Sequence, residues 1–264
     1  MADMLILGLG YTAGRLADTL QRDGWSTIGV RRQSAPGILA FADDEAVRAA
    51  IATSTHILSS VPPEGEDDPV LDRYGDALAT APARWIGYLS STGVYGDAGG
   101  AWVDESAVIG GGRRTARADA DRSWGELRGD VFRFRLPGIY GPGRSAIDRV
   151  LAGKAHRVDL RTQVFSRVHV DDIVSGIVAS FGKTPGIYNL ADDLPCAQNQ
   201  LIEAACALTG TPLPPLQSPD EAGLSDAARG FYAENRRVAN GRAKRMLGWA
   251  PRYPSYVEGL RACL

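Results

Sequence analysis

The chain has 264 residues, and its 29 Lys and Arg against 31 Asp and Glu give a formal net charge of -2 at pH 7. This length can bury a sizeable core, either as one α/β domain or as a nucleotide-binding core with a smaller appendage. The near-neutral balance excludes a sequence-wide basic field, so we expect neither nucleic acid nor a membrane surface as a partner.

The first residues and the cysteines indicate the compartment. The apolar stretch Leu5–Leu9 is far too short for a signal peptide or a membrane span. Cys196, Cys206 and Cys263 lie far apart and form no C-x-x-C pair, which indicates free thiols. We therefore expect a cytoplasmic protein.

From residue 4 to about residue 136, short apolar runs alternate with segments of helical periodicity, as is typical of parallel strands with crossover helices. Six strands are predicted, at 4–7, 26–30, 37–41, 56–60, 85–90 and 131–136. Helices are predicted near 13–23, 43–52, 69–80 and 114–127. Because the strands are short and do not alternate strictly, we expect helices on both faces of the sheet.

The pattern changes after Pro137. The predicted elements are a turn-rich segment at 138–143, a short helix at 146–152, a strand at 164–170, a helix at 171–181 and a strand at 186–190 that returns to the main sheet. The remaining chain has a predicted helix at 197–209, a Pro-rich stretch at 212–219 and a helix at 235–247 closed by Gly248.

A glycine motif, G-x-G-x-x-A, follows the first strand and opens the first helix. Gly8 allows a tight turn, Gly10 lets the backbone approach a pyrophosphate, and Ala13 permits close packing of helix on strand. The first helical residues, Tyr11 and Thr12, would offer free N–H groups and a partial positive charge to phosphates. The strand, turn and helix context predicts dinucleotide binding; the alternative is a glycine-rich turn that holds no ligand.

The residues after the second strand favour NADP over NAD. An acidic residue there would bind the ribose of NAD, but this chain has Arg31 and Arg32. Guanidinium groups attract a 2′-phosphate through charge-assisted hydrogen bonds. The alternative is that one of the pair is a solvated surface cation.

These elements predict an α/β fold with a Rossmann-type doubly wound parallel sheet and a small C-terminal α/β lobe. The dinucleotide-binding core would span residues 1–145, with 164–191 returning to it. Residues 146–163 and 192–264 would form the lobe, which we expect to select the substrate.

Several further motifs, in this order and spacing, resemble the extended and atypical short-chain dehydrogenase/reductases, the NAD-dependent epimerase/dehydratase group. They are LSSTGVYGD at 89–97, RLPGIYGPG at 135–143, VHVDDI at 168–173, YNLADD at 188–193 and LGWAPRY at 247–253. The resemblance implies a set of cofactor contacts after the fourth, fifth and sixth strands: Ser59, Ser60, Val61, Ser90, Pro137, Gly138 and Ile139.

The catalytic set of that group is incomplete here. The group uses a Tyr as general acid and base, a Lys four residues later, and a Ser or Thr that binds the reacting oxygen. Ser91 matches the last position, with Thr92 beside it, but neither Tyr nor Lys occurs between Val103 and Arg128. Arg117 could supply positive charge in that segment, although a guanidinium is a poor proton donor at neutral pH.

Replacement acids could come from four residues, each also compatible with a purely structural role: Tyr95, Tyr140, Asp119 and Asp121. His169, Asp171 and Asp172 lie at a strand-to-helix junction in relatives, so we expect Asp171 or Asp172 to cap the helix. No histidine spacing supports a metal ligand set, and we predict no metal site.

Two functions remain open. The first is an NADP-dependent oxidoreductase, or an epimerase/dehydratase-like enzyme, acting on an unidentified small molecule, with Ser91, Thr92 and Tyr95 as candidate catalytic residues. The second is a non-catalytic NADP(H)-binding sensor or scaffold. The helices at 69–80 and 114–127 are faces through which relatives dimerise, so a homodimer is expected unless both simply pack on the sheet.

Overall fold

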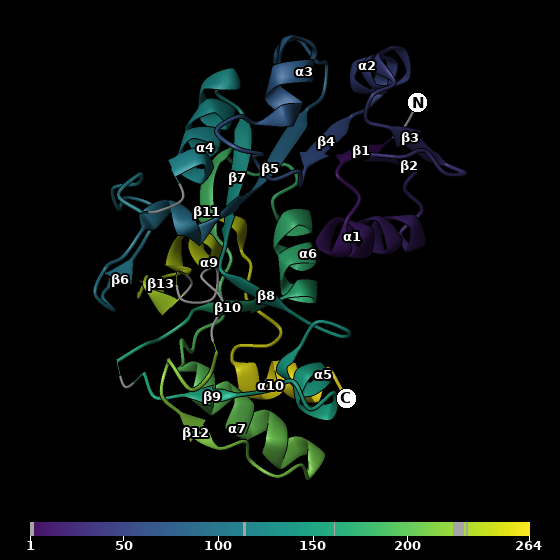
Figure 1. The fold of residues 1–264 in the computed structure, drawn as a ribbon. Coiled ribbons are helices and arrows are strands. Elements are labelled where there is room, and N and C mark those ends of the chain that lie inside the picture. The colour runs from purple at the N-terminus through teal and green to yellow at the C-terminus, as the bar shows by residue number, and fades with distance from the viewer. Residues whose placement is uncertain (1–2, 113–114, 161, 224–229, 231) are drawn as a thin grey trace.

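The chain builds one parallel sheet with a smaller lobe below it, as Figure 1 shows for the computed structural model, which describes residues 3–112, 115–160, 162–223, 230 and 232–264. The seven strands lie in the order β11 (Gly186–Asn189), β7 (Val131–Leu136), β5 (Trp85–Ser91), β4 (His56–Ser59), β1 (Met4–Leu7), β2 (Thr27–Arg31) and β3 (Ile38–Ala40). All neighbouring pairs are parallel. The chain moves outward in both directions from β1 and β4, which confirms the doubly wound sheet predicted from the sequence.

Helices cover both faces of this sheet. Cores form beneath α1 (Tyr11–Arg22) and α6 (Val170–Ala179) on one face, and beneath α2 (Asp44–Thr53), α3 (Pro69–Ala79) and α4 (Thr115–Leu127) on the other. Strand β1 supplies both cores, because Met4 and Ile6 join the first and Leu5 and Leu7 the second. Burial on both faces explains why the strands read as continuous apolar runs.

The lobe has its own apolar cluster, which includes Ile147, Leu201, Ile202 and Leu260. Its helices are α5 (Ala146–Leu151), α7 (Gln198–Thr209) and α10 (Tyr256–Arg261), at the bottom of Figure 1. Outside the main sheet, short parallel pairs join β10 (Arg167–His169) to β8 (Gly138–Tyr140), β12 (Leu216–Gln217) to β9 (Arg157–Val158), and β13 (Arg237–Val238) to β6 (Trp102–Val103).

Three predicted elements differ from the structure. The segment at 138–143 was expected to be a turn, but its first three residues form β8, which pairs with β10; the strand expected at 164–170 is therefore only three residues long. The helix expected at 235–247 is α9, and it begins only at Gly241. Residues 237–238 are extended because they pair with β6, a long-range contact that helical periodicity cannot reveal.

The cysteines agree with the expectation from their spacing. Cys196, Cys206 and Cys263 are all free, and the first two are buried. Within the described part of the chain, no helix combines the length and apolarity that crossing a membrane requires.

A buried polar network ties α4 to the sheet. The carboxylate of Asp121 is fully buried and accepts hydrogen bonds from Ser90 Oγ at 2.7 Å and from Arg135 Nη2 at 2.7 Å. Arg135 also donates to the hydroxyl of Tyr95 at 3.1 Å, and that hydroxyl donates to Asn189 Oδ1 at 2.8 Å. The network therefore links helix α4 and the strands β5, β7 and β11 to the 3₁₀ turn η1 (Thr92–Tyr95) that follows β5.

Two carboxylates of α4 give a matched test of this network. Asp121→Asn should lower the free energy of unfolding by about 3 to 5 kcal/mol, because Arg135 would keep a buried charge without its counterion. Asp119→Asn should change it by less than about 1 kcal/mol, because the Asp119 pair with Arg122 is exposed. Urea denaturation measures both values, and equal losses would contradict the structural role given to Asp121.

Candidate functional site

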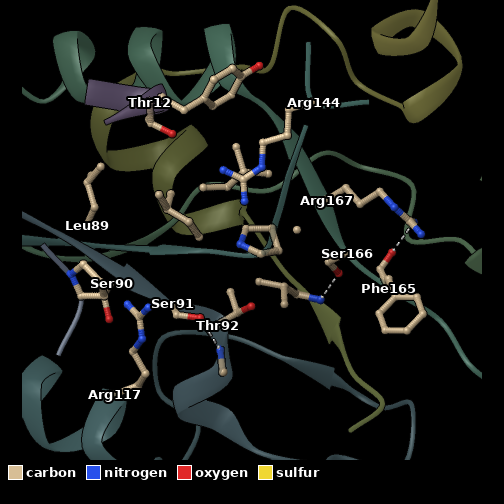
Figure 2. A pocket seen from close by; sticks show the side chains of 18 of the residues that line it. Thr12, Leu89, Ser90, Ser91, Thr92, Arg117, Arg144, Phe165, Ser166 and Arg167 are labelled. Atoms are coloured by element: carbon tan, nitrogen blue, oxygen red, sulfur yellow. Dashed lines mark hydrogen bonds between the residues drawn. The ribbon is translucent and has the colours of Figure 1, made fainter. Parts of the chain in front are cut away.

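Two cavities lie at the carboxyl ends of the strands, the usual ligand position in such sheets. The larger, about 560 Å³, lies between the sheet and the lobe (Figure 2). The smaller, about 490 Å³, lies beside the end of β2. Three residues line both cavities: Gly10, Ser60 and Pro62. The two spaces therefore meet at the start of α1.

The turn between β1 and α1 separates the two cavities. Gly8 has φ +91, and a Cβ on it would lie 2.8 Å from Cγ2 of Val61. Its carbonyl also accepts a hydrogen bond from the Ser60 hydroxyl. A side chain at this position would be strained and would collide, so the turn needs glycine.

Gly10 differs from Gly8 because a Cβ on it would meet nothing within 4 Å among the described residues. Gly10 is the N-cap of α1 and has no side chain to cap the first-turn amides, and the first helical residues Tyr11, Thr12 and Ala13 line the larger cavity. This space and these donors fit a pyrophosphate, which the positive end of a helix attracts. Ala13 is 1% exposed and packs in the core, as its place in the motif predicts.

The predicted site residues gather around these cavities, with two exceptions. Those that line the larger cavity are Gly10, Tyr11, Thr12, Ala13, Ser60, Ser90, Ser91, Thr92, Pro137, Gly138 and Ile139. Those that line the smaller one are Gly8, Gly10, Arg31, Arg32, Ser60 and Val61. Ser59 is fully buried within β4 and lines neither cavity, and Tyr95 also lines neither.

Tyr95 was a candidate acid, but the structure does not bring it to the cavity. Its hydroxyl bonds Arg135 and Asn189 within the buried network, and burial raises the pKa of Tyr95. Ser91 and Thr92, by contrast, do line the larger cavity. The Ser91 hydroxyl accepts a hydrogen bond from the amide of Gly93 at 3.1 Å and keeps its own proton available for donation.

The other candidate acids are also placed by the structure. Asp119 is exposed and pairs with Arg122, whereas Asp121 belongs to the buried network. The Tyr140 hydroxyl is buried against Gly259 and has no hydrogen-bond partner among the described residues, and burial raises the pKa of Tyr140. None of these three lines the larger cavity.

The arginines of the smaller cavity make few other bonds. Arg31 Nε donates to the carbonyl of Leu9 at 2.8 Å, which holds the glycine turn against the end of β2. Arg32 lies 3.8 Å from Glu64, and both side chains are mostly exposed. An exposed pair of this kind is weak and leaves the Arg32 guanidinium open to another anion.

The expected cap of α6 is corrected by the structure. The N-cap is His169, whose Nδ1 accepts a hydrogen bond from the amide of Asp171, while Asp171 and Asp172 lie in the first helical turn. Asp172 accepts instead from the amides of Arg252 and Tyr253, which fixes the C-terminal segment to α6. The described residues hold no group of three or more His, Cys, Asp or Glu suited to a metal ion.

Sequence reasoning missed the lobe side of the larger cavity. The residues there include Arg144, Phe165, Arg167, Gln198, Glu234 and Arg236. Arg144 directly follows the RLPGIYGPG motif, so its position could have been noticed. The others come from separate segments that only the folded chain brings together.

Asp192, three residues after β11, is another buried carboxyl. It is 2% exposed, and its Oδ2 has no hydrogen-bond partner among the described residues. Burial raises the pKa of Asp192 to about 8, although the Arg167 charge opposes this shift.

Comparisons with known proteins agree with this geometry. No family model matches the sequence. A 3-diazoavenalumate denitrifying reductase from a Streptomyces species is 35% identical over 147 residues, which are 51% of this chain and 47% of the reductase. The match thus spans about half the length of the reductase.

Solved structures match the whole chain. A conserved protein of unknown function from Silicibacter pomeroyi is 39% identical, with a TM-score of 0.92 over 100% of this chain and 98% of that one. MoeE5 in complex with UDP-glucuronic acid and NAD is 20% identical (TM-score 0.78, 98% and 97% covered), and the human epimerase family protein SDR39U1 with NADPH is 16% identical (TM-score 0.80, 98% and 97% covered). The chain belongs to the same family as the Silicibacter protein, and it shares the fold of MoeE5 and SDR39U1.

Asp192 makes stability depend on pH. The unfolded carboxyl ionises near pH 3.9 and the folded one near 8, so between these values the folded chain holds one more proton. The stability that Asp192 contributes is fully present below about pH 4, and it is lost progressively as the pH rises to about 8. Asp192→Asn should therefore gain melting temperature relative to wild type between pH 5 and pH 8. Asp193→Asn is the matched neighbouring control, and a difference that does not change with pH would contradict the assignment.

Proposed function

We propose that the chain binds NADP(H) across the two cavities. The adenosine end would lie in the smaller cavity, the pyrophosphate against the amides at the start of α1, and the nicotinamide in the larger cavity beside Pro137–Ile139. The observation that carries the proposal is the junction of the two cavities at Gly10, where the chain leaves open space in front of a helix N-terminus.

The preference for NADP rests on the end of β2. Both arginines line the smaller cavity, and Glu64 is the only carboxylate among the residues that line it. A 2′-phosphate would compete with Glu64 for Arg32, because bidentate bonds to phosphate are stronger than an exposed pair at 3.8 Å. MoeE5 holds NAD and SDR39U1 holds NADPH, so the preference proposed here comes from this chain's own residues.

For activity we propose an oxidoreductase acting on a small molecule in the larger cavity. A bound nicotinamide dinucleotide supplies a hydride donor or acceptor. The Ser91 hydroxyl would donate a hydrogen bond to the reacting oxygen of the substrate, with Thr92 beside it. The reductase named among the relatives supports this class of reaction.

The absence of a Tyr and Lys pair from α4 favours a second function, a sensor that binds NADP(H) without turnover. Epimerase or dehydratase chemistry would need a proton acceptor, and the candidates Asp119, Asp121 and Tyr140 lie outside the larger cavity. Hydride transfer to a positioned carbonyl depends least on a general acid or base, since general acid catalysis contributes only about 10² to 10⁴ in rate.

A substrate screen distinguishes the enzyme from the sensor. Carbonyl compounds are incubated with the protein and NADPH, and oxidation is followed at the NADPH absorbance. We expect turnover with at least one compound, reduced about tenfold or more in Ser91→Ala because a hydrogen bond to the developing oxyanion is lost. Ser106→Ala, a change at an exposed turn, is the control. Tight NADPH binding without any turnover would support the sensor instead.

The cofactor preference is tested with arginine variants. Arg32→Ala should weaken NADPH binding about tenfold or more and leave NADH binding nearly unchanged, because only NADPH carries the 2′-phosphate. Arg31→Ala with Arg32→Ala should weaken NADPH binding further. Arg48→Ala, which removes a surface pair with Asp76, is the control. Calorimetry measures each affinity, and equal losses for both dinucleotides would refute the 2′-phosphate assignment.

A further inference from the structure

The walls of the larger cavity carry an excess of positive charge. Four guanidinium groups line it, from Arg117, Arg144, Arg167 and Arg236. Among the residues that line the cavity, Glu234 is the only carboxylate. A cavity with this balance favours an anion, and the low dielectric of a half-enclosed space strengthens that preference.

Two of these guanidinium groups are engaged by the protein itself. Arg236 Nη1 bonds Glu234 at 2.9 Å and the carbonyl of Gly96. Arg167 is 5% exposed and is held by the carbonyls of Phe165 and Cys196 and by Gln198 Oε1. Arg167 and Arg236 therefore form part of the cavity wall, and their guanidinium groups already have hydrogen-bond partners within the protein.

Arg144 is placed for the cofactor. Its guanidinium lies 5.6 Å from the centre of the Tyr11 ring, at the start of α1. In Figure 2 it lies on the same side of the cavity as Thr12. This position suits a charge that complements the proposed pyrophosphate.

Arg117 is the cation on the opposite side. It is half-buried, and Figure 2 shows its guanidinium directed toward Ser90 and Ser91. No carboxylate of a described residue lies within 4.0 Å of it: on the same helix, Asp119 pairs with Arg122, and Asp121 pairs with Arg135.

The setting of Arg117 favours an anion for a second reason. Arg117 lies in the first turn of α4, and the described first turn holds no acidic side chain. The positive end of the helix adds to the guanidinium charge instead of offsetting it. The nearby Tyr88 hydroxyl does not neutralise Arg117, since burial raises the pKa of Tyr88 and keeps it protonated.

Part of the cavity wall is apolar. It includes Leu89, Leu136, Ile139, Val164, Phe165 and Val238. These side chains would hold an aliphatic or aromatic body by burial of its surface.

We infer that the larger cavity takes a carboxylic acid with an apolar body, whose carboxylate is bound by Arg117 beside Ser91. A guanidinium and a carboxylate match in geometry and form paired, charge-assisted hydrogen bonds. This inference rests on the proposed function, because it names the class of substrate that the nicotinamide would meet. Arg117 occupies the helix that carries the Tyr and Lys of relatives, and its role here is to bind the substrate.

The test uses matched carboxylates and amides. Benzoate, cinnamate and phenylpyruvate, each with its neutral amide, are titrated into the purified protein by calorimetry, with and without saturating NADP⁺. At least one acid should bind about tenfold or more tightly than its amide. Arg117→Gln should abolish this preference and Arg117→Lys should restore part of it. Arg122→Gln, on the exposed face of the same helix, should leave it unchanged.

Each outcome is informative. If no acid binds better than its amide in either condition, or if the preference survives in Arg117→Gln, the carboxylate site is overturned, whatever NADP⁺ does. If the preference depends on Arg117 but the same samples bind no NADP⁺, the carboxylate site stands and the proposed cofactor function fails.

Discussion

The left-handed turn at Gly8 is the constraint on which both cavities depend. It turns the chain between β1 and α1 at a position where a Cβ would lie 2.8 Å from Cγ2 of Val61, so the turn packs directly against the segment that follows β4. The amides of Gly8 and Leu9 donate to the carbonyl of Val30, and Arg31 Nε donates to the carbonyl of Leu9, so the end of β2 is held to the same turn. The first turn of α1 thereby borders the junction of the cavities, and the proposed cofactor position follows from this arrangement.

A second constraint positions the chemistry. Asp121 and Arg135 are buried together, and their bonds to Ser90 and Tyr95 fix the chain on both sides of Ser91. Tyr95 therefore stabilises the wall of the site instead of entering it. Asp119 and Asp121 of α4 pair with Arg122 and Arg135, and Arg117 is the charged residue of this helix that lines the cavity.

Sequence reasoning recovered the features that depend on local pattern. The seven strands of the sheet, the glycine turn and the cavity wall after β5 and β7 follow from apolar runs and short motifs. The lobe side was not predictable, because Phe165, Gln198 and Arg236 come from separate segments. Pairing of β13 with β6 likewise replaces the first part of the helix predicted at 235–247.

The most direct measurement is a crystal structure of the protein grown with NADPH. Continuous density is expected through both cavities, with the pyrophosphate on the amides of Tyr11 and Thr12, the 2′-phosphate at Arg32 and the nicotinamide between Pro137 and Ser91. A dinucleotide bound elsewhere, or an adenosine end outside the cavity beside β2, would contradict the proposed cofactor position.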